Sequence, residues 1–446
     1  MVVLKFGGSS VATIEMIDAI LDIVQQRLDE APVLVSSAMG KTTDRLVEAT
    51  DAAGHGDREG YQRVYNELRS AHEDTVGQIA DTAIRERATR RLSDLFDEVQ
   101  ALLTGVYLIQ ECSPRTRDAV LSFGERLATE IVHARACERG IDSILLDSRD
   151  LIRTDDEFNA ANVEFTETTT RIRAYVTPTS GRVIVLQGFI ARTADGVTST
   201  LGRGGSDYSA SIIAAALDAQ KLEIWTDVDG IMTMDPQIVP EARTVDSMSY
   251  DEAAELAFFG ARVVHPSTIQ PAVDRGIPVY VRNTRNPDRT GTRISGTGDE
   301  EGPRALASKS PTTVITIHSS RMLNAYGFLA RIFAIFERHR LSVDVVATSE
   351  VSVSVTLDDP PDLSGLMSDL AEFGRVERED DQALICIVGN RLWRRSETVA
   401  RVFDSLRDIP IRLISLGSSD VNLTLIVPSD SLQRAVRTLH NTLFVP

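Results

Sequence analysis

Short runs of aliphatic and β-branched residues alternate with amphipathic helical patterns through the first two-thirds of the chain. Residues 13–28 place apolar side chains at helical spacing, and polar-rich helical patterns cover residues 44–109 and 113–139. Buried strands are predicted at residues 2–6, 32–36, 143–147, 183–187 and 222–226, with an alanine-rich helix at 207–218. This alternation predicts an α/β fold, a three-layer αβα arrangement around a mostly parallel sheet. Ligands of such sheets bind at the carboxyl ends of the strands.

The pattern changes near residue 290. Residues 295–311 are polar, contain Gly and Pro, and predict a linker. Two copies of a ferredoxin-like β-α-β-β-α-β pattern follow. The second copy has almost no chain left for its last strand, so we expect the two copies to share or exchange one. The predicted domains are residues 1–295, 312–380 and 381–446.

The composition is that of a soluble globular protein, which excludes a wholly disordered or fibrous chain. The formal net charge of −18 argues against a nucleic-acid surface and against docking on an anionic membrane. We expect no signal peptide and no membrane span, because the apolar stretches are short. Cys112, Cys137 and Cys386 are too widely spaced for a zinc site or a disulfide framework, which fits a reduced, cytoplasmic compartment.

Two glycine-rich loops open predicted helices. Lys5-Phe6-Gly7-Gly8-Ser9-Ser10 follows the first strand, where glycines admit a phosphate and the lysine can reach its oxygens. The lysine precedes the glycines, so this is not the P-loop motif, and an ordinary tight turn is the alternative. Residues 201–207 form the second loop, for which the alternative is a solvent loop with an N-cap. Two such loops in one parallel sheet favour phosphoryl transfer.

Three further motifs admit a functional and a structural interpretation. The Thr-Asp pair in residues 225–230 could bind a nucleotide, or the Asp-Gly that follows could simply turn the chain. Glu125, near the start of a helix, could recognise an amino group or favour the helix dipole. In residues 260–266, Arg262 could face phosphates, whereas His265 beside a proline is interpreted as structural. The histidines form no ligand-spaced cluster, and no protein metal site is predicted.

Taken together in chain order, these motifs resemble those of the aspartate kinases of the amino-acid kinase family. The resemblance covers nearly the whole chain, and its markers are residues 5–10, 36–44, 123–127, 187–189, 201–209, 225–230, 252–256 and 259–266. Residues 322–330 and 342–353 resemble the paired ACT regulatory domains of that family. The resemblance implies that MgATP phosphorylates the side-chain carboxylate of L-aspartate to 4-phospho-L-aspartate, the first committed step towards lysine, threonine and methionine.

The resemblance also implies roles for single positions. The catalytic residues would be Lys5, Arg203 and Asp207, with Asp207 orienting Lys5. ATP and Mg²⁺ are the implied cofactors, and the ATP-binding positions would be Lys5, Gly7, Gly8, Ser9, Thr226, Asp227, Met232, Gln237 and Arg262. The aspartate-binding positions would be Thr43, Glu125, Arg203, Gly204, Gly205 and Ser206. A carboxylate is already a nucleophile, so we expect in-line transfer without a strong general base or a covalent phosphoenzyme.

Three positions depart from the family pattern. Arg262 replaces a lysine that is frequent before Val-Leu-His-Pro, keeping the charge with a different shape. Met232 stands where an aromatic residue is common. Gln237 stands where Asp-Pro-Arg is usual, which removes a cation near the expected nucleotide site and predicts weaker ATP affinity.

The repeats predict feedback regulation by an amino acid. Residues 322–328 and 342–350 resemble lysine-inhibited members more than others, and the implied effector positions are Met322, Phe328, Val343, Asp344 and Ser349. Ordinary core and loop packing is the alternative for these positions. We expect lysine, with threonine as the alternative, to bind at paired ACT domains between subunits of a homodimer or homotetramer.

Other functions are less consistent with the motifs. A kinase for glutamate, acetylglutamate or a nucleoside monophosphate does not explain the Phe-Gly-Glu-Arg motif and the repeated tail. A catalytically silent amino-acid sensor does not explain the intact set of Lys5, Arg203 and Asp207. We also expect no fused homoserine dehydrogenase, because the chain stops at Pro446 without a dinucleotide fold.

Overall fold

The computed structural model describes residues 1–260, 264–296, 301–323, 325–358, 362–417 and 419–445, which fall into two compact units. Unit 1 consists of Met1–Ile231 and Val263–Gly296, and unit 2 of Met232–Arg262 and Thr297–Pro446. The segment Met232–Arg262, which we expected in the first domain, thus clusters with the C-terminal repeats. The domain boundaries stay a prediction.

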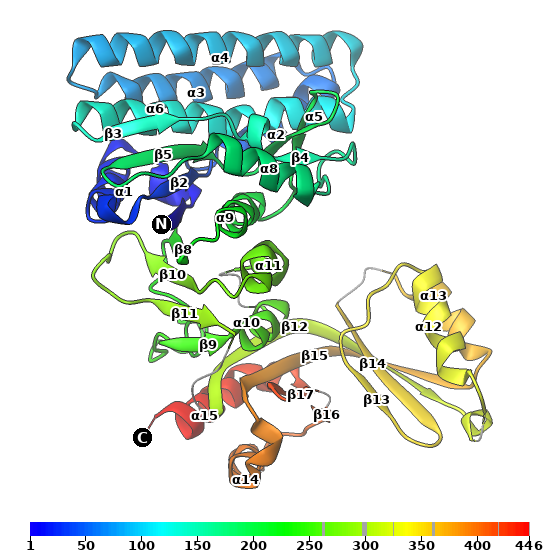
Figure 1. Ribbon diagram of the computed structural model, residues 1–446. Helices are drawn as coiled ribbons and strands as arrows, with labels where there is room; N and C mark the ends of the chain where they lie inside the picture. The colour runs from blue at the N-terminus through cyan, green and yellow to red at the C-terminus, as the bar shows by residue number, and fades with distance from the viewer. Residues whose placement is uncertain (261–263, 297–300, 324, 359–361, 418, 446) are drawn as a thin grey trace. The chain divides into compact units, whose positions relative to one another are not determined.

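A mostly parallel sheet forms the centre of unit 1 (Figure 1). Its neighbouring strands are, in order, β3 (Asp142–Leu145), β5 (Arg182–Gln187), β2 (Val33–Ser36), β1 (Val2–Phe6), β8 (Lys221–Thr226), β10 (Val279–Asn283) and β11 (Thr292–Ser295). The strands from β3 to β10 are parallel, and β11 is antiparallel to β10. Central strands covered on both faces explain the continuous apolar runs in the sequence. The predicted fold class is confirmed.

Helices cover both faces of this sheet. On one face lie α1 (Ile14–Gln25) and α6 (Phe123–Glu138), with α3 (Arg58–Gly77) and α4 (Thr82–Ile109) outside α6 (Figure 1). The other face carries α8 (Phe165–Tyr175), α9 (Gly205–Ala216) and α11 (Pro266–Asp274). The helical region predicted at 44–109 consists of three separate helices, which are α2 (Thr42–Gly54), α3 and α4.

Shorter elements complete unit 1. The 3-10 helix η1 (Gly8–Val11) follows β1, and α5 (Pro114–Leu121) precedes α6. A small sheet holds β4 (Arg153–Thr154), β6 (Ile190–Thr193) and β7 (Thr198–Thr200), and the short helix α7 (Ser148–Leu151) precedes β4.

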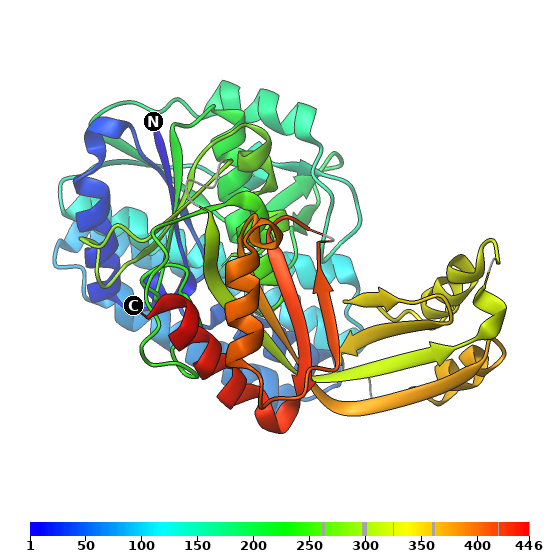
Figure 2. The ribbon, with the colours of Figure 1, turned by 90° about the horizontal axis from the view of Figure 1, so that it is seen from below.

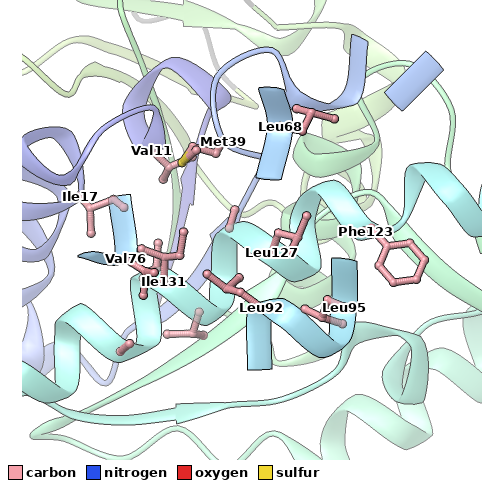
Figure 3. Close-up of a cluster of buried hydrophobic side chains, with 14 of the residues drawn as sticks. Val11, Ile17, Met39, Leu68, Val76, Leu92, Leu95, Phe123, Leu127 and Ile131 are labelled. Atoms are coloured by element: carbon pink, nitrogen blue, oxygen red, sulfur yellow. The ribbon is translucent and has the colours of Figure 1, made fainter. Parts of the chain in front are cut away.

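A continuous apolar core joins the helices to the sheet in unit 1. Figure 3 shows part of it, with Val11 near Met39 and, from α4 and α6, Leu92 near Leu127 and Ile131. Burying such side chains stabilises the fold by roughly 1.5–3 kcal/mol each. This packing fixes the starts of α2 and α6, which carry predicted site residues.

A six-stranded antiparallel sheet organises unit 2. Its order is β13 (Val346–Thr348), β14 (Ser352–Asp358), β12 (Gly302–His318), β15 (Arg375–Asn390), β17 (Asn422–Pro428) and β16 (Leu413–Leu416). The first repeat adds α12 (Phe328–Arg338) and α13 (Ser364–Ala371), and the second adds α14 (Ser396–Ser405) and α15 (Leu432–Phe444). After the short strand β9 (Ser247–Ser249), α10 (Tyr250–Phe258) packs on β12 and β15.

The long strands β12 and β15 run side by side through both repeats (Figure 2). Residues 312–318 of β12 pair with β14 of the first repeat, whereas residues 302–309 pair with the half of β15 that adjoins β17. The linker predicted at 295–311 is therefore wrong for residues 302–311, whose polar side chains concealed a strand. These residues supply the strand that the second repeat lacks, as the expected sharing required.

Among the described residues, no helix is both long enough and apolar enough to cross a membrane.

The shared strand makes a testable contribution to stability. Leu306 on β12 is only 2% exposed and lies in the core of the second repeat. We expect Leu306→Ala to cost about 2–5 kcal/mol of unfolding free energy, through lost burial and a residual cavity. Calorimetric unfolding measures the effect, with Leu329→Ala as control because Leu329 on α12 is 38% exposed. Equal melting of the two variants would contradict a strand role for residues 302–309.

Candidate active site

A cavity of about 530 Å³ opens at the carboxyl edge of the unit 1 sheet. We call it the strand-edge cavity. It is bounded by the end of β1, the loop after β2, and the starts of α2, α6 and α9. The predicted residues that line it are Lys5, Gly8, Thr43, Glu125, Arg203, Gly204, Gly205, Ser206 and Asp207. The structure therefore brings together every position predicted for aspartate and all three predicted catalytic residues.

Lys5 and Asp207 form the central ion pair of this cavity. Lys5 lies near the end of the central strand β1, and Asp207 lies in the first turn of α9. Lys5 Nζ is 2.6 Å from Asp207 Oδ1, so the predicted charge-assisted contact is present. Both side chains are mostly buried, which strengthens the attraction and fixes the direction of the ammonium group.

Glu125 is a buried carboxylate with incomplete hydrogen bonding. It is 3% exposed, and its Oε1 accepts a hydrogen bond from the Ala38 N–H at 3.2 Å. Its Oε2 has no hydrogen-bond partner among the described residues. Burial raises the pKa of Glu125 to about 8, against the opposing effects of backbone hydrogen bonds and the Lys5 charge. An ammonium group entering the cavity would satisfy this carboxylate.

Arg203 lies in the second glycine loop and is exposed at the cavity. It forms no ion pair with any residue that the structure describes, so its guanidinium group is available to a ligand. Packing also explains why this loop contains glycine. Gly204 has a φ of +73°, and a Cβ there would lie 2.7 Å from Thr268 Cγ2, so packing alone already requires glycine at this position.

Asp118 is a buried site residue that no sequence motif indicated. Its carboxylate accepts hydrogen bonds from the N–H of Asn159 at 3.0 Å and from the N–H and hydroxyl of Thr200 at 2.8 Å each. Asn159 and Thr200 both line the strand-edge cavity, and Thr200 precedes the loop that bears Arg203. No local signal marks Asp118, because these partners lie 41 and 82 positions away in the sequence.

The predicted nucleotide contacts divide between the two units. Gly7 precedes η1, which Gly8 and Ser9 begin. On the neighbouring strand β8, Thr226 is the last residue and Asp227 follows it. The Gly7 N–H already donates to the Trp225 carbonyl at 3.2 Å, so Gly7 holds β1 to β8 through this group. Met232 and Gln237 belong to unit 2, and Arg262 lies outside the described residues. Their roles stay predictions.

The five predicted effector positions lie in the first repeat of unit 2. Phe328 is buried against Phe373, with ring centroids 5.6 Å apart, and Val343 and Met322 pack on the same core. This is the ordinary packing named above as the alternative. Asp344 Oδ2 lies 3.4 Å from Lys309 Nζ, and burial raises the pKa of Asp344 although Lys309 opposes the shift. Ser349 is exposed.

Metal-binding side chains do not gather in the described part of the chain. No group of three or more His, Cys, Asp or Glu residues there could hold a metal ion.

Comparisons with known proteins identify the family of the chain. The amino acid kinase family model matches residues 1–283, and an ACT domain model matches residues 385–443. The chain is 36% identical to the lysine-sensitive aspartokinase 3 of Escherichia coli over 460 residues, covering 99% of each chain. It is also 36% identical to the chloroplastic aspartokinase 2 of Arabidopsis thaliana over 468 residues, covering 99% of this chain and 84% of that one.

Solved structures give the same result. Aspartokinase III of E. coli in complex with aspartate and ADP matches with a TM-score of 0.82 and 35% identity, covering 100% of both chains. The aspartate kinase of Clostridium acetobutylicum matches with a TM-score of 0.84 and 26% identity, covering 99% of this chain and 100% of that one. The family resemblance noted in the sequence is confirmed: the chain belongs to the amino acid kinase family, as an aspartate kinase with C-terminal ACT domains.

Proposed function

We propose that this aspartate kinase transfers the γ-phosphoryl group of ATP to the side-chain carboxylate of L-aspartate in the strand-edge cavity. The product is 4-phospho-L-aspartate, which enters lysine, threonine and methionine synthesis. One observation supports the assignment most strongly: Lys5, Glu125 and Arg203 line a single cavity. The cavity thus offers an ammonium group, a carboxylate and a guanidinium group. Within the described part of the chain, one oxygen of that carboxylate has no hydrogen-bond partner and the guanidinium forms no ion pair. These groups match phosphoryl oxygens, the substrate ammonium and a substrate carboxylate.

Substrate binding follows from these charges. Arg203 holds a carboxylate of aspartate through two parallel N–H groups, and Glu125 Oε2 accepts a hydrogen bond from the α-ammonium. Thr43 and Ser206 add hydroxyl groups at the starts of α2 and α9. The start of α9 directs the positive end of the helix dipole towards negative charge, although the N–H of its first residue, Gly205, already donates to the Gly202 carbonyl at 3.0 Å.

Transfer then depends on position and charge neutralisation. The aspartate carboxylate attacks in line, and it needs no general base because it is already ionised. Lys5 stabilises the phosphoryl oxygens, and Asp207 keeps its ammonium group in place. Mg²⁺ bound with ATP supplies further neutralisation. The described side chains offer no metal cluster, which fits an ion held mainly by phosphate oxygens and water.

Regulation is proposed to act through the repeats. We infer that lysine binds at paired ACT domains between subunits of a homodimer or homotetramer and favours a less active state. The lysine-sensitive E. coli relative supports this, as does the E. coli structure in complex with lysine and aspartate, which matches with a TM-score of 0.81 at 34% identity. A cytoplasmic location is part of the same proposal, based on the three widely spaced cysteines.

A hydroxamate assay with ATP and Mg²⁺ tests the reaction and its regulation together. We expect aspartyl hydroxamate to form with aspartate and little product with glutamate, as the proposed substrate requires. Added lysine should inhibit. Strong inhibition by threonine without inhibition by lysine would refute the choice of effector, and an on-pathway phosphorylated residue would refute direct transfer.

The raised pKa of Glu125 predicts a pH effect on both substrate binding and stability. The carboxylate must ionise to bind an ammonium group, so the KM for aspartate should fall as pH rises through about 8. In the folded state its pKa exceeds the ordinary 4.5, so its stabilising contribution is complete below about pH 4.5 and is lost as pH rises through about 8.

Glu125→Gln tests both effects. The variant should bind aspartate weakly with no pH dependence near 8, yet melt at a higher temperature than the wild type at about pH 9, because no buried charge forms. Glu130→Gln, on the same helix, serves as control. If the variant is less stable than the wild type at high pH, the folded protein stabilises the ionised form of Glu125, and the prediction is wrong.

Asp118 is predicted to position the Arg203 loop. We expect Asp118→Asn to raise the KM for aspartate about tenfold, roughly 1.4 kcal/mol, with the KM for ATP unchanged. Lost hydrogen bonds should also cost about 1–3 kcal/mol of stability. Steady-state kinetics, with aspartate and ATP varied in turn, measures the two KM values separately. Asp94→Asn, at an exposed position, is the control. Equal changes in both KM values would indicate a general structural role instead.

A further inference from the structure

Unit 2 contains a second cavity, of about 680 Å³, whose lining shares only Asp344 with the effector positions named above. It is lined by α10, by the segment entering β13 of the first repeat, and by β16, β17 and their connection in the second repeat. We call it the α10 cavity. Its volume lies within the range of small-molecule sites, about 300–1,000 Å³.

One face of α10 is turned to this cavity. Asp251, Ala254, Glu255 and Phe258 follow the spacing i, i+3, i+4, i+7, which places them on one side of a helix. The helix is held by its other residues, since Ala253 and Leu256 are buried and Ser249 and Glu252 form a capping box. On the face turned to the cavity, Glu255 contacts Asn422 of β17, whereas Phe258 remains 54% exposed.

The lining is strongly anionic. Asp251 and Glu255 come from α10, Asp344 from the segment before β13, and Asp420 from the connection before β17. No Lys, Arg or His is among the described residues that line the cavity. Lys309 contacts Asp344 but also pairs with Asp358, so it offsets only part of the negative charge.

A separate observation indicates a missing hydrogen-bond donor. Asn422 on β17 lines the cavity and is only 8% exposed. Its Nδ2 donates to Glu255 Oε2 at 2.7 Å, whereas its Oδ1 has no hydrogen-bond partner among the described residues. A buried acceptor without a partner is unfavourable, and an incoming N–H group would satisfy it.

We propose that the α10 cavity binds a linear aliphatic diamine or polyamine. Its ammonium groups meet the carboxylates and Asn422 Oδ1, and its methylene chain lies along Phe258 and Val346. A free amino acid fits less well, because Lys309, the cation beside Phe258 and Asp344, is already paired with the carboxylates of Asp344 and Asp358 and would have to leave them to bind an α-carboxylate. A bare metal ion would leave the apolar surface unused, and the described residues form no metal-binding group.

Isothermal titration of the full-length protein with spermidine and with 1,4-diaminobutane tests this proposal. We expect saturable binding that weakens at least tenfold in an Asp251→Asn/Glu255→Gln double variant, because two of the cavity's carboxylates are neutralised. The side-chain amide introduced by Glu255→Gln can still accept the hydrogen bond from Asn422. Glu397→Gln, exposed on α14, is the control and should bind as the wild type does.

Three outcomes would overturn the proposal. They are absence of binding, equal weakening in the Glu397→Gln control, and displacement of spermidine by L-lysine with the same dependence on Asp251 and Glu255. The last result would make the cavity an amino-acid site.

Tryptophan fluorescence gives a second readout that does not depend on the folding of the double variant. The chain has two tryptophans, and the indole N–H of Trp393 donates to the Asp420 carboxylate, whereas Trp225 is buried in unit 1. Spermidine should change the emission of the wild type with the affinity found by titration, and Trp393→Phe should abolish the change. A change that persists without Trp393 would place the ligand elsewhere and refute the site.

Discussion

The ion pair between Lys5 and Asp207 is the interaction on which the active site depends. It joins the end of the central strand β1 to the first turn of α9, two segments about 200 positions apart in the chain. Parallel strands bring their carboxyl ends to one edge of the sheet. A lysine near the end of β1 and a helix that starts beside it therefore lie close together at that edge. The ion pair holds the Lys5 ammonium group in one place beside a glycine loop. A fixed positive charge of this kind stabilises a phosphoryl group during transfer.

Two buried carboxylates, one lining the strand-edge cavity and one hydrogen-bonded to residues that line it, have different hydrogen bonding. Asp118 receives three hydrogen bonds from neighbouring protein groups and ties the cavity wall to α5. Glu125 receives one at Oε1 and keeps Oε2 free of any partner among the described residues. Both have pKa values raised by burial, but only Glu125 is left with an unmet acceptor. The first carboxylate is satisfied by the fold, and the second is the one that we propose binds the substrate ammonium group.

Unit 2 also has carboxylates around a cavity, but they are held by an antiparallel sheet. Because β12 and β15 belong to both repeats, the two repeats form one continuous sheet and cannot be separated without breaking it. The α10 cavity lies where both repeats meet a helix that the sequence pattern assigned to the kinase domain. A cation bound there would contact three segments at once, so its binding energy would favour whichever arrangement of unit 2 closes them around it.

Local patterns were sufficient for five strands of the unit 1 sheet, most helices, the glycine loops and the family resemblance, because buried parallel strands and amphipathic helices leave periodic signals. They missed β10 and β11 of the same sheet. They could not predict the strand at 302–311, whose polar residues are stabilised by pairing with β15, or Asp118, whose partners are remote in sequence. The sequence alone was enough to select Lys5, Glu125 and Arg203 as charged candidates for the site. That Glu125 is desolvated with one oxygen unpaired, and that four carboxylates surround the α10 cavity, follows from long-range packing, which alone sets burial and the distance between charges.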